Sequence, residues 1–286
     1  MNIKFLLLIA LVFSLHGNRA LAYSATTNFG FDLEQDTSGN AYIRKGNFIS
    51  GTWSPGSATA VYTVVDSSNV QITYVSGITI NSSYNGTIWA VTQSNSNYPN
   101  ELMTLTLNGV TMKAVRTSTR TLSGLGTGYT IYNLNYNPTT HTLNALLNDD
   151  TLVSINPSTG AGTTVKLHVD SGFHLSGLTN DSSGNLYTFV TGTTNTVLKL
   201  NPTTGTTVSS QSYYGTITTT TKNNCVRYDT ASGSMFYAIG GAGTSTLSTS
   251  NTNPTSSANF SSSTITSIGS NTVLDCSCGT SSTDCI

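Results

Sequence analysis

The stretch Leu178–Val208, LTNDSSGNLYTFVTGTTNTVLKLNPTTGTTV, decides the fold that the sequence predicts. Short apolar runs alternate with turn-forming clusters, and charged residues are almost absent. The turn NPTTG (Asn201–Gly205) suits a tight hairpin, because Pro fixes φ and Gly accepts positive φ. Together with the residues just before it, the stretch predicts four strands: Ser176–Thr179, Leu186–Val190, Thr196–Leu200 and Thr206–Ser210.

The same pattern recurs along the chain. NPSTG (Asn156–Gly160) repeats the hairpin turn about 45 residues earlier, and similar strand–turn–strand units begin at Leu33, Ile78, Leu134, Leu178 and Val226. The longest step is explained by a Gly-rich insertion at Arg116–Thr130. Steps of roughly 45 to 55 residues, with several strands per unit and no helical pattern, are typical of a β-propeller.

The segment GLTNDSSGNLYTFVTGTTNTVLKLNPTTG (Gly177–Gly205) resembles a blade of the NHL/YVTN/lactonase-like propeller families. The resemblance covers two units well and three loosely. It implies an all-β propeller and leaves the activity open, because such blades occur in lactonases, lyases, lectins and scaffolds. We expect five four-stranded blades, or six if the chain ends combine into a split blade; a β-solenoid or sandwich is the competing fold.

The N-terminus has the features of a secretory signal peptide. Lys4 forms a short basic region, Phe5–Leu15 is apolar, and Ala20–Ala22 has the small-x-small form of a cleavage site. A membrane anchor is the alternative, although the apolar run is shorter than the roughly 20 residues that span a bilayer. We therefore divide the chain into a signal peptide (1–22), a propeller domain (23–275) and a Cys-rich tail (276–286).

Composition narrows the range of partners. The chain has 8% charged residues and a formal net charge of −1. This charge predicts no binding to nucleic acid. No second long apolar run follows the N-terminal one, so we expect no insertion into a membrane. Tyr, Val, Ile and Thr are plentiful, which favours strands over disorder. We expect a secreted, extracellular protein.

The cysteines and the glycosylation sequons are consistent with an exported protein. The four cysteines, Cys225, Cys276, Cys278 and Cys285, predict two disulfides with the pairing left open. A zinc site is the alternative. Four N-x-S/T sequons predict glycosylation at Asn81, Asn85, Asn180 and Asn259. We place the first three in turns between first and second strands, which would leave the opposite face of the ring open for binding.

That open face collects the candidate site residues. His168, Asp170 and His174 come from one loop, and Asp149 and Asp150 from another. They could hold a divalent cation whose bound water attacks an ester or lactone. The simpler interpretation is a solvated loop with turn-forming Asp. Tyr98 and Tyr129 could stack on a ligand, or could simply end strands.

Three functions follow from these residues. The first is a non-catalytic recognition module that binds a glycan or an extracellular protein and needs no cofactor. The second is a metal-dependent lactonase or hydrolase that uses the His168 region. The third is a structural extracellular coat protein. No nucleophile elbow and no phosphate-binding Gly-rich loop occurs in the sequence.

Overall fold

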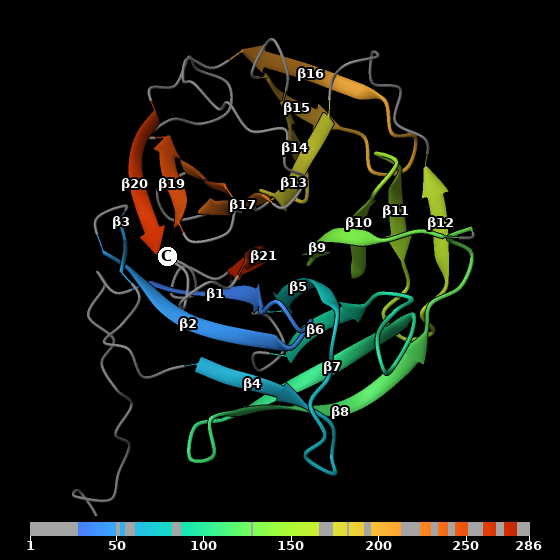
Figure 1. Cartoon of the computed structure of the whole chain (residues 1–286). Coiled ribbons are helices and arrows are strands. Elements are labelled where there is room, and N and C mark those ends of the chain that lie inside the picture. The colour runs from blue at the N-terminus through green and yellow to red at the C-terminus, as the bar shows by residue number, and fades with distance from the viewer. Residues whose placement is uncertain are drawn as a thin grey trace, which may run out of the picture.

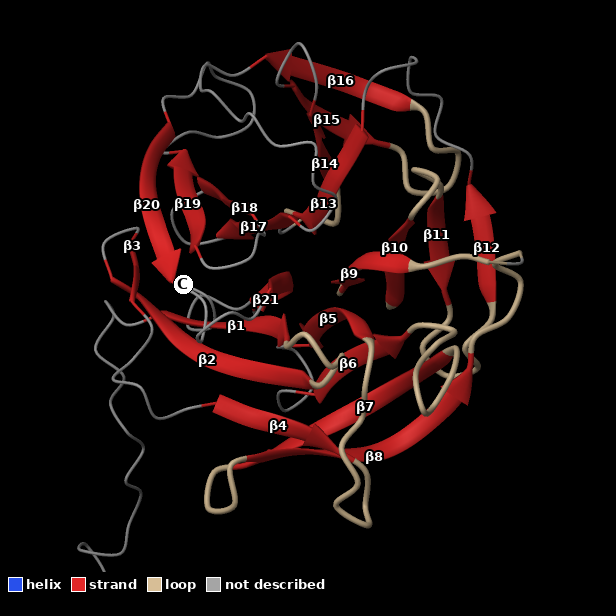
Figure 2. Ribbon diagram, viewed as in Figure 1, coloured by secondary structure: helices blue, strands red, loops and turns tan. Residues whose placement is uncertain are grey.

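All regular structure in the described part of the chain is β-strand (Figure 2). The computed structural model describes residues 28–49, 52–54, 61–81, 87–126, 128–165, 174–181, 183–191, 196–212, 224–229, 234–239, 244–250, 260–266 and 272–278. None of these residues belongs to a helix long and apolar enough to cross a membrane.

Three sheets have four antiparallel strands each. They are β9 (Ile131–Asn137), β10 (Thr142–Leu147), β11 (Leu152–Ile155) and β12 (Gly162–Val165); β13 (His174–Asn180), β14 (Leu186–Thr191), β15 (Thr196–Leu200) and β16 (Thr207–Ser212); and β17 (Asn224–Asp229), β18 (Ser234–Ile239), β19 (Thr244–Ser250) and β20 (Phe260–Thr266). The predicted strands of the 178–208 unit are thereby confirmed as β13–β16.

The fourth sheet has nine strands. Its order is β21-β1-β2-β4-β8-β7-β6-β5, with β3 paired to β2. The bounds are β1 (Asn28–Gln35), β2 (Ala41–Ile49), β3 (Thr52–Ser54), β4 (Val61–Val65), β5 (Val75–Asn81), β6 (Thr87–Thr92), β7 (Glu101–Asn108), β8 (Lys113–Thr121) and β21 (Thr272–Cys278).

The sheets radiate from a common centre (Figure 1). Strands β21, β5, β9, β13 and β17 form an inner ring, in which each lies beside the next and β17 returns to β21. Such radial closure protects the sheet edges, and it defines a β-propeller. The predicted all-β propeller is confirmed.

The last strand closes the ring. β21 pairs antiparallel with β1, so the two ends of the described chain share one sheet. At the outside, β4 pairs parallel with β8 and joins two four-stranded groups, β21-β1-β2-β4 and β5-β6-β7-β8, into the nine-stranded sheet. The five-blade count therefore stays a prediction.

Two sequence expectations need correction. The unit at Leu33 was expected to begin with an inner strand, but β21 takes that position, so β1 and β2 are the second and third strands of their group. The expected insertion Arg116–Thr130 is wrong in its first part, because Arg116–Thr121 completes β8 and pairs with β7. Strand β21 includes residues on both sides of the predicted boundary between 275 and 276, and the division into domains stays a prediction.

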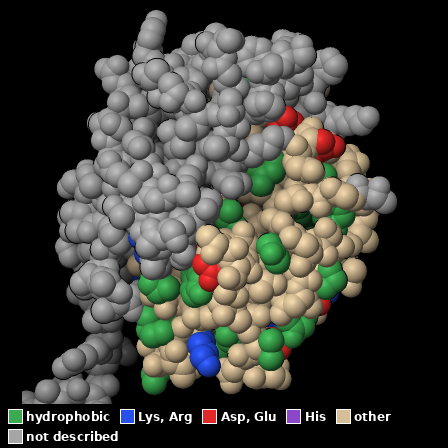
Figure 3. Space-filling view, viewed as in Figure 1, with side chains coloured by type: hydrophobic (Ala, Val, Ile, Leu, Met, Phe, Trp, Pro, Cys, Tyr) green, Lys and Arg blue, Asp and Glu red, His purple; other side chains and the backbone are tan. Residues whose placement is uncertain are grey.

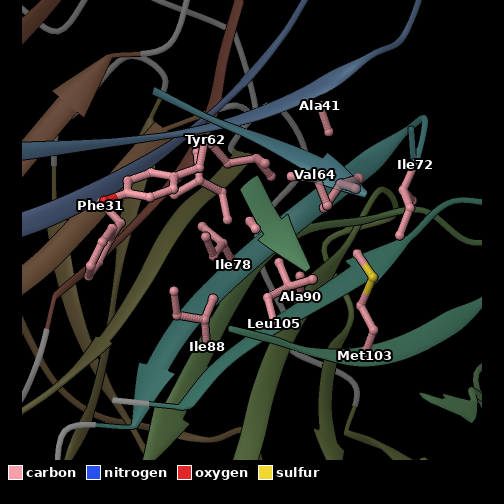
Figure 4. Packing of buried hydrophobic residues seen from close by; sticks show 14 of the residues in the cluster. Phe31, Ala41, Tyr62, Val64, Ile72, Ile78, Ile88, Ala90, Met103 and Leu105 are labelled. Carbon is pink, nitrogen blue, oxygen red and sulfur yellow. The ribbon is translucent and has the colours of Figure 1, made fainter. Parts of the chain in front are cut away.

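The largest apolar core fills the space between the two groups of the nine-stranded sheet (Figure 4). Alternation along the strands builds it, since residues two apart share a face. Leu33, Ile43 and Val64 approach from one side, and Ile78 and Met103 from the other, all fully buried. Two smaller cores fill the next two gaps around the ring.

Candidate functional site

In each four-stranded group, counted outward from the centre of the ring, the loops after the second and the fourth strand lie on the same face. We call it the loop face. Its described segments are residues 66–74, 93–100, 122–126, 128–130 and 148–151, together with the hairpin between β1 and β2. Backbone hydrogen bonds hold neighbouring segments together: Tyr74 N donates to Gly39 O over 2.8 Å, and Asn148 N to Thr130 O over 2.9 Å. This is the face on which the sequence placed the candidate residues.

Tyr98 lies in a polar cluster at the rim of the loop face. Its hydroxyl donates to Asp66 Oδ2 over 2.5 Å, and the Arg116 guanidinium lies 3.8 Å from its ring centroid. Arg116 Nη1 also pairs with Glu101 Oε2 at 2.8 Å. The hydrogen bond from Tyr98, followed by those from Val70 N and Ser68 N, lowers the pKa of Asp66. The same bond raises the pKa of Tyr98.

Asp150 links two inner strands. Its Oδ1 accepts hydrogen bonds from the Tyr132 hydroxyl at 3.1 Å and from Leu175 N at 3.3 Å. The carboxylate therefore lies at the start of β13, next to His174 in the sequence. Burial, followed by the nearby Asp150 charge, raises the pKa of Tyr132 well above its ordinary value. Asp149 is exposed, and it accepts a hydrogen bond from Thr151 N at 3.1 Å.

The other predicted loop-face residues are only partly described. His168 and Asp170 lie outside the described residues, and of His174 only the backbone is described. Tyr129 packs against an apolar core, and burial raises its pKa. Among the described residues, no three His, Cys, Asp or Glu side chains gather as metal ligands would. The metal hypothesis stays a prediction.

Two of the four glycosylation sequons lie at the strand ends opposite the loop face. Asn81 and Asn180 end the inner strands β5 and β13, whereas Asn85 and Asn259 lie outside the described residues. The Asn180 side chain is buried, and its Oδ1 accepts a hydrogen bond from Asn135 Nδ2. Because this side chain is buried, a glycan on Asn180 Nδ2 requires the packing around it to open, or must be added before β9 and β13 pack together.

Three of the four cysteines lie on two neighbouring inner strands. Cys225 belongs to β17, and Cys276 and Cys278 belong to β21. β17 and β21 adjoin at the ring closure. Cys285 lies outside the described residues, and the disulfide pairing stays open.

A buried charge cluster joins β1 and β2. Arg44 Nη2 lies 2.5 Å from Asp32 Oδ2 and 2.9 Å from Glu34 Oε1, and all three side chains are at most 7% exposed. Burial raises the pKa of Asp32 to about 7, although the Arg44 charge and hydrogen bonds act against it. Two buried carboxylates thus share one guanidinium, and the excess negative charge favours the protonated form of Asp32.

A cavity of about 620 Å³ lies in the group β5–β8, at the end where the β5–β6 and β7–β8 hairpins turn. Its described lining combines aromatic, aliphatic and hydroxyl side chains: Phe31, Ile80, Thr87, Ile88, Trp89, Thr104, Leu105, Thr106, Leu107 and Thr117. The sequence analysis missed this cavity. The residues Thr104-Leu105-Thr106-Leu107 alternate, so hydroxyls lie on one face of β7 and apolar side chains on the other, and no local pattern in the sequence marks the cavity.

In the described part of the face that Figure 3 shows, charged side chains are few and scattered among other side chains and backbone.

Comparisons with known proteins concern the fold alone. No protein-family model matches the chain, and no curated protein matches it significantly. Apo AztD from Citrobacter koseri is 10% identical with a TM-score of 0.40, over 86% of this chain and 62% of that chain, so this chain spans less than two thirds of AztD.

Two further solved structures show the same level of likeness. The Cps50 (Swd1) β-propeller domain of Myceliophteria thermophila is 9% identical with a TM-score of 0.43, over 85% of this chain and 72% of that chain. The exo-β-1,3-galactanase of Phanerochaete chrysosporium, solved with galactose, is 9% identical with a TM-score of 0.45, over 68% and 52%. None of them bears on the activity of this chain.

Proposed function

We propose that the chain is a secreted glycoprotein that acts as a non-catalytic recognition module for a glycan or an extracellular protein. One observation favours recognition over metal-dependent catalysis. Asp150, the best described of the predicted metal ligands, is engaged by the Tyr132 hydroxyl and by Leu175 N, and so serves to hold β9 and β13 together.

The Tyr98 cluster supports the same function. Asp66, Glu101 and Arg116 are engaged with Tyr98 or with each other, which makes the rim of the loop face rigid rather than reactive. A rigid rim suits recognition, because little conformational entropy is lost on binding.

A glycan array combined with metal analysis tests this function. The purified full chain is expected to bind at least one glycan, to contain no stoichiometric metal, and to leave lactone and ester substrates unhydrolysed. Asp150→Ala is expected to lower stability without creating or removing an activity.

Stoichiometric calcium or zinc, together with hydrolysis that Asp170→Ala abolishes, would overturn the proposal in favour of the metal-dependent hydrolase. Recovery of the native protein only as an insoluble matrix component, with no ligand bound, would favour the structural coat.

A further inference from the structure

We propose that Cys225 and Cys276 form a disulfide that locks the closed ring. The inference goes beyond the proposed recognition function, and it takes from that function only the export that allows cysteines to stay oxidised. Cys225 belongs to β17 and Cys276 to β21, and these two inner strands adjoin where the ring closes. The places of the cysteines along the two strands decide which of them can meet.

The inner strands share a common register, which a β-bulge marks. The pairing of β5, β9 and β21 with the second strand of each group skips one residue of the inner strand. We call the residue after the skipped one the first position and the residue after that the second position. The first positions are Gly77, Asn133 and Asp275, and the second positions are Ile78, Leu134 and Cys276.

Strand β17 fits the same register through the hairpin that ends it. In β5 and β9 the second position lies three residues before the last paired residue of the strand, which is Asn81 or Asn137. In β17 the last paired residue is Asp229, and Val226 lies three residues before it. Val226 is therefore the second position of β17, and Cys225 is its first position.

First positions meet second positions of the next inner strand around the ring. A Cβ added to Gly77 of β5 would lie 3.1 Å from the Cβ of Leu134 in β9. Asp275 of β21 reaches β5 at the same level, because its Oδ2 accepts a hydrogen bond from Ile78 N at 2.9 Å. The next strand after β17 in this direction is β21, so the same rule applies at the ring closure.

This rule places Cys225 opposite Cys276. A disulfide needs two Cβ atoms about 3.5–4.5 Å apart, and the Gly77–Leu134 pair shows that the ring brings these two positions at least that close. Cys278 lies two residues farther along β21, which is roughly 6.6 Å on a strand. That distance is too long for a direct bond, so the register selects Cys276.

Formation of this bond is an oxidation. Two S–H bonds break and one S–S bond forms, while two protons and two electrons pass to a disulfide oxidant, such as oxidised glutathione, which is reduced to two thiols. The bond closes a loop that contains β18, β19 and β20. It therefore restricts the unfolded chain and stabilises the closed ring.

Two matched variants test the pairing. Cys278→Ser/Cys285→Ser keeps Cys225 with Cys276, whereas Cys276→Ser/Cys285→Ser keeps Cys225 with Cys278. Each folded chain is oxidised in a glutathione buffer, alkylated and digested with trypsin, which releases Cys225 in the peptide 223–227. Mass spectrometry should find this peptide linked to the C-terminal peptide in the first variant and unlinked in the second.

Melting temperatures provide an independent measurement. Cys225→Ser and Cys276→Ser should each lower the melting temperature by at least about 5 °C, because each removes the same bond. For the same reason the double variant should lose no more than either single variant. Additive losses would contradict a shared bond. If a variant fails to fold, peptide mapping of the unmodified chain decides the result.

The outcomes separate this inference from the proposed function. A link between Cys225 and Cys276 in the unmodified chain supports the inference. A link from Cys225 to Cys278 or Cys285, or an unlinked Cys225 in the oxidised chain, overturns it and leaves recognition standing. Absence of glycan binding leaves the disulfide standing, because neither measurement uses a ligand.

Discussion

Two aspartates organise hairpins through the same four hydrogen bonds. Asp181 Oδ1 accepts from Ser183 N and Asn185 N, while Oδ2 accepts from Asn185 Nδ2 and the Tyr187 hydroxyl. Asp36 does the same in the hairpin between β1 and β2. Each hairpin also contains a glycine with a positive φ: Gly39 at 85° and Gly184 at 81°. The repeated Asp-x-Ser-Gly-Asn-x-Tyr sequence is thus a hairpin motif.

Replacement of this aspartate should destabilise the protein. Asp181→Ala leaves two backbone N–H groups, an amide and a phenol without their acceptor, so we expect a loss of about 2 kcal/mol in the free energy of unfolding. Asp149→Ala is the control, since Asp149 is exposed and accepts one hydrogen bond, and should cost under about 0.5 kcal/mol. Urea denaturation measures both values; equal effects would contradict the motif's role.

At the scale of strands, β9 docks on its neighbour through alternate asparagines. Asn133 Oδ1 accepts from Gly177 N at 2.7 Å, Asn135 Nδ2 donates to Asn180 Oδ1, and Asn137 Nδ2 donates to Gly184 O at 3.0 Å. Residues two apart in a strand share a face, so the sequence NLNYN presents one polar edge to β13 and to the turn that follows it. Polar side chains here replace part of an apolar core.

The buried cluster on β1 and β2 predicts a pH dependence of stability. Burial raises the pKa of Asp32 to about 7, above its ordinary value of 3.8. Between these values the folded chain binds a proton that the unfolded chain has released, so Asp32 makes the free energy of unfolding fall as pH rises through this window. Below pH 4 the contribution is fully present.

Comparison with Asp32→Asn isolates this contribution. The amide cannot titrate, so the difference in unfolding free energy between the unmodified chain and Asp32→Asn should change steadily from pH 4 to pH 7, in favour of the variant at the higher pH. Chemical denaturation at each pH measures it. A difference that stays constant, or that changes in the opposite direction, would show that Asp32 is charged in the folded chain throughout this range.

At the scale of the whole molecule, Asp275 ties the closing strand to two other inner strands. Its Oδ2 accepts from Ile78 N at 2.9 Å and from Leu134 N at 3.1 Å, and its Oδ1 accepts from Asn133 Nδ2 at 3.2 Å. The residue is fully buried. Gly77, which precedes Ile78, has no side chain that could accept a hydrogen bond from Leu134 N. The Asp275 carboxylate accepts this hydrogen bond instead.

Substitution of Asp275 should therefore weaken the closed ring as a unit. Asp275→Ala leaves three buried donors without this acceptor and should cost about 3 kcal/mol or more, whereas Asp275→Asn keeps one acceptor oxygen and should cost less. Thermal unfolding followed by circular dichroism ranks the two variants. A native melting temperature for Asp275→Ala would contradict the proposed role in closure.

Part of this structure was predictable from local sequence. The 178–208 unit predicted strands β13–β16 closely, because hairpin turns and period-two alternation depend on residues near one another in the chain. The errors came where strands pair over long sequence distances: β21 displaces β1 from the centre, and β8 continues to Thr121 because β7 extends beside it.

The candidate site was also predictable from local sequence only in part. Turn chemistry predicted Asp149 and Asp150 in a tight turn, but only the packing of β13 beside β9 places Asp150 against Leu175 N and makes it a structural link. The cavity beside Trp89 depends on Phe31 from β1 meeting β5–β7 across the nine-stranded sheet. Local residues therefore determine strands, hairpins and alternation in this protein. Ring closure, buried charges and the cavity depend on contacts between residues far apart in the sequence, which only the tertiary structure brings together.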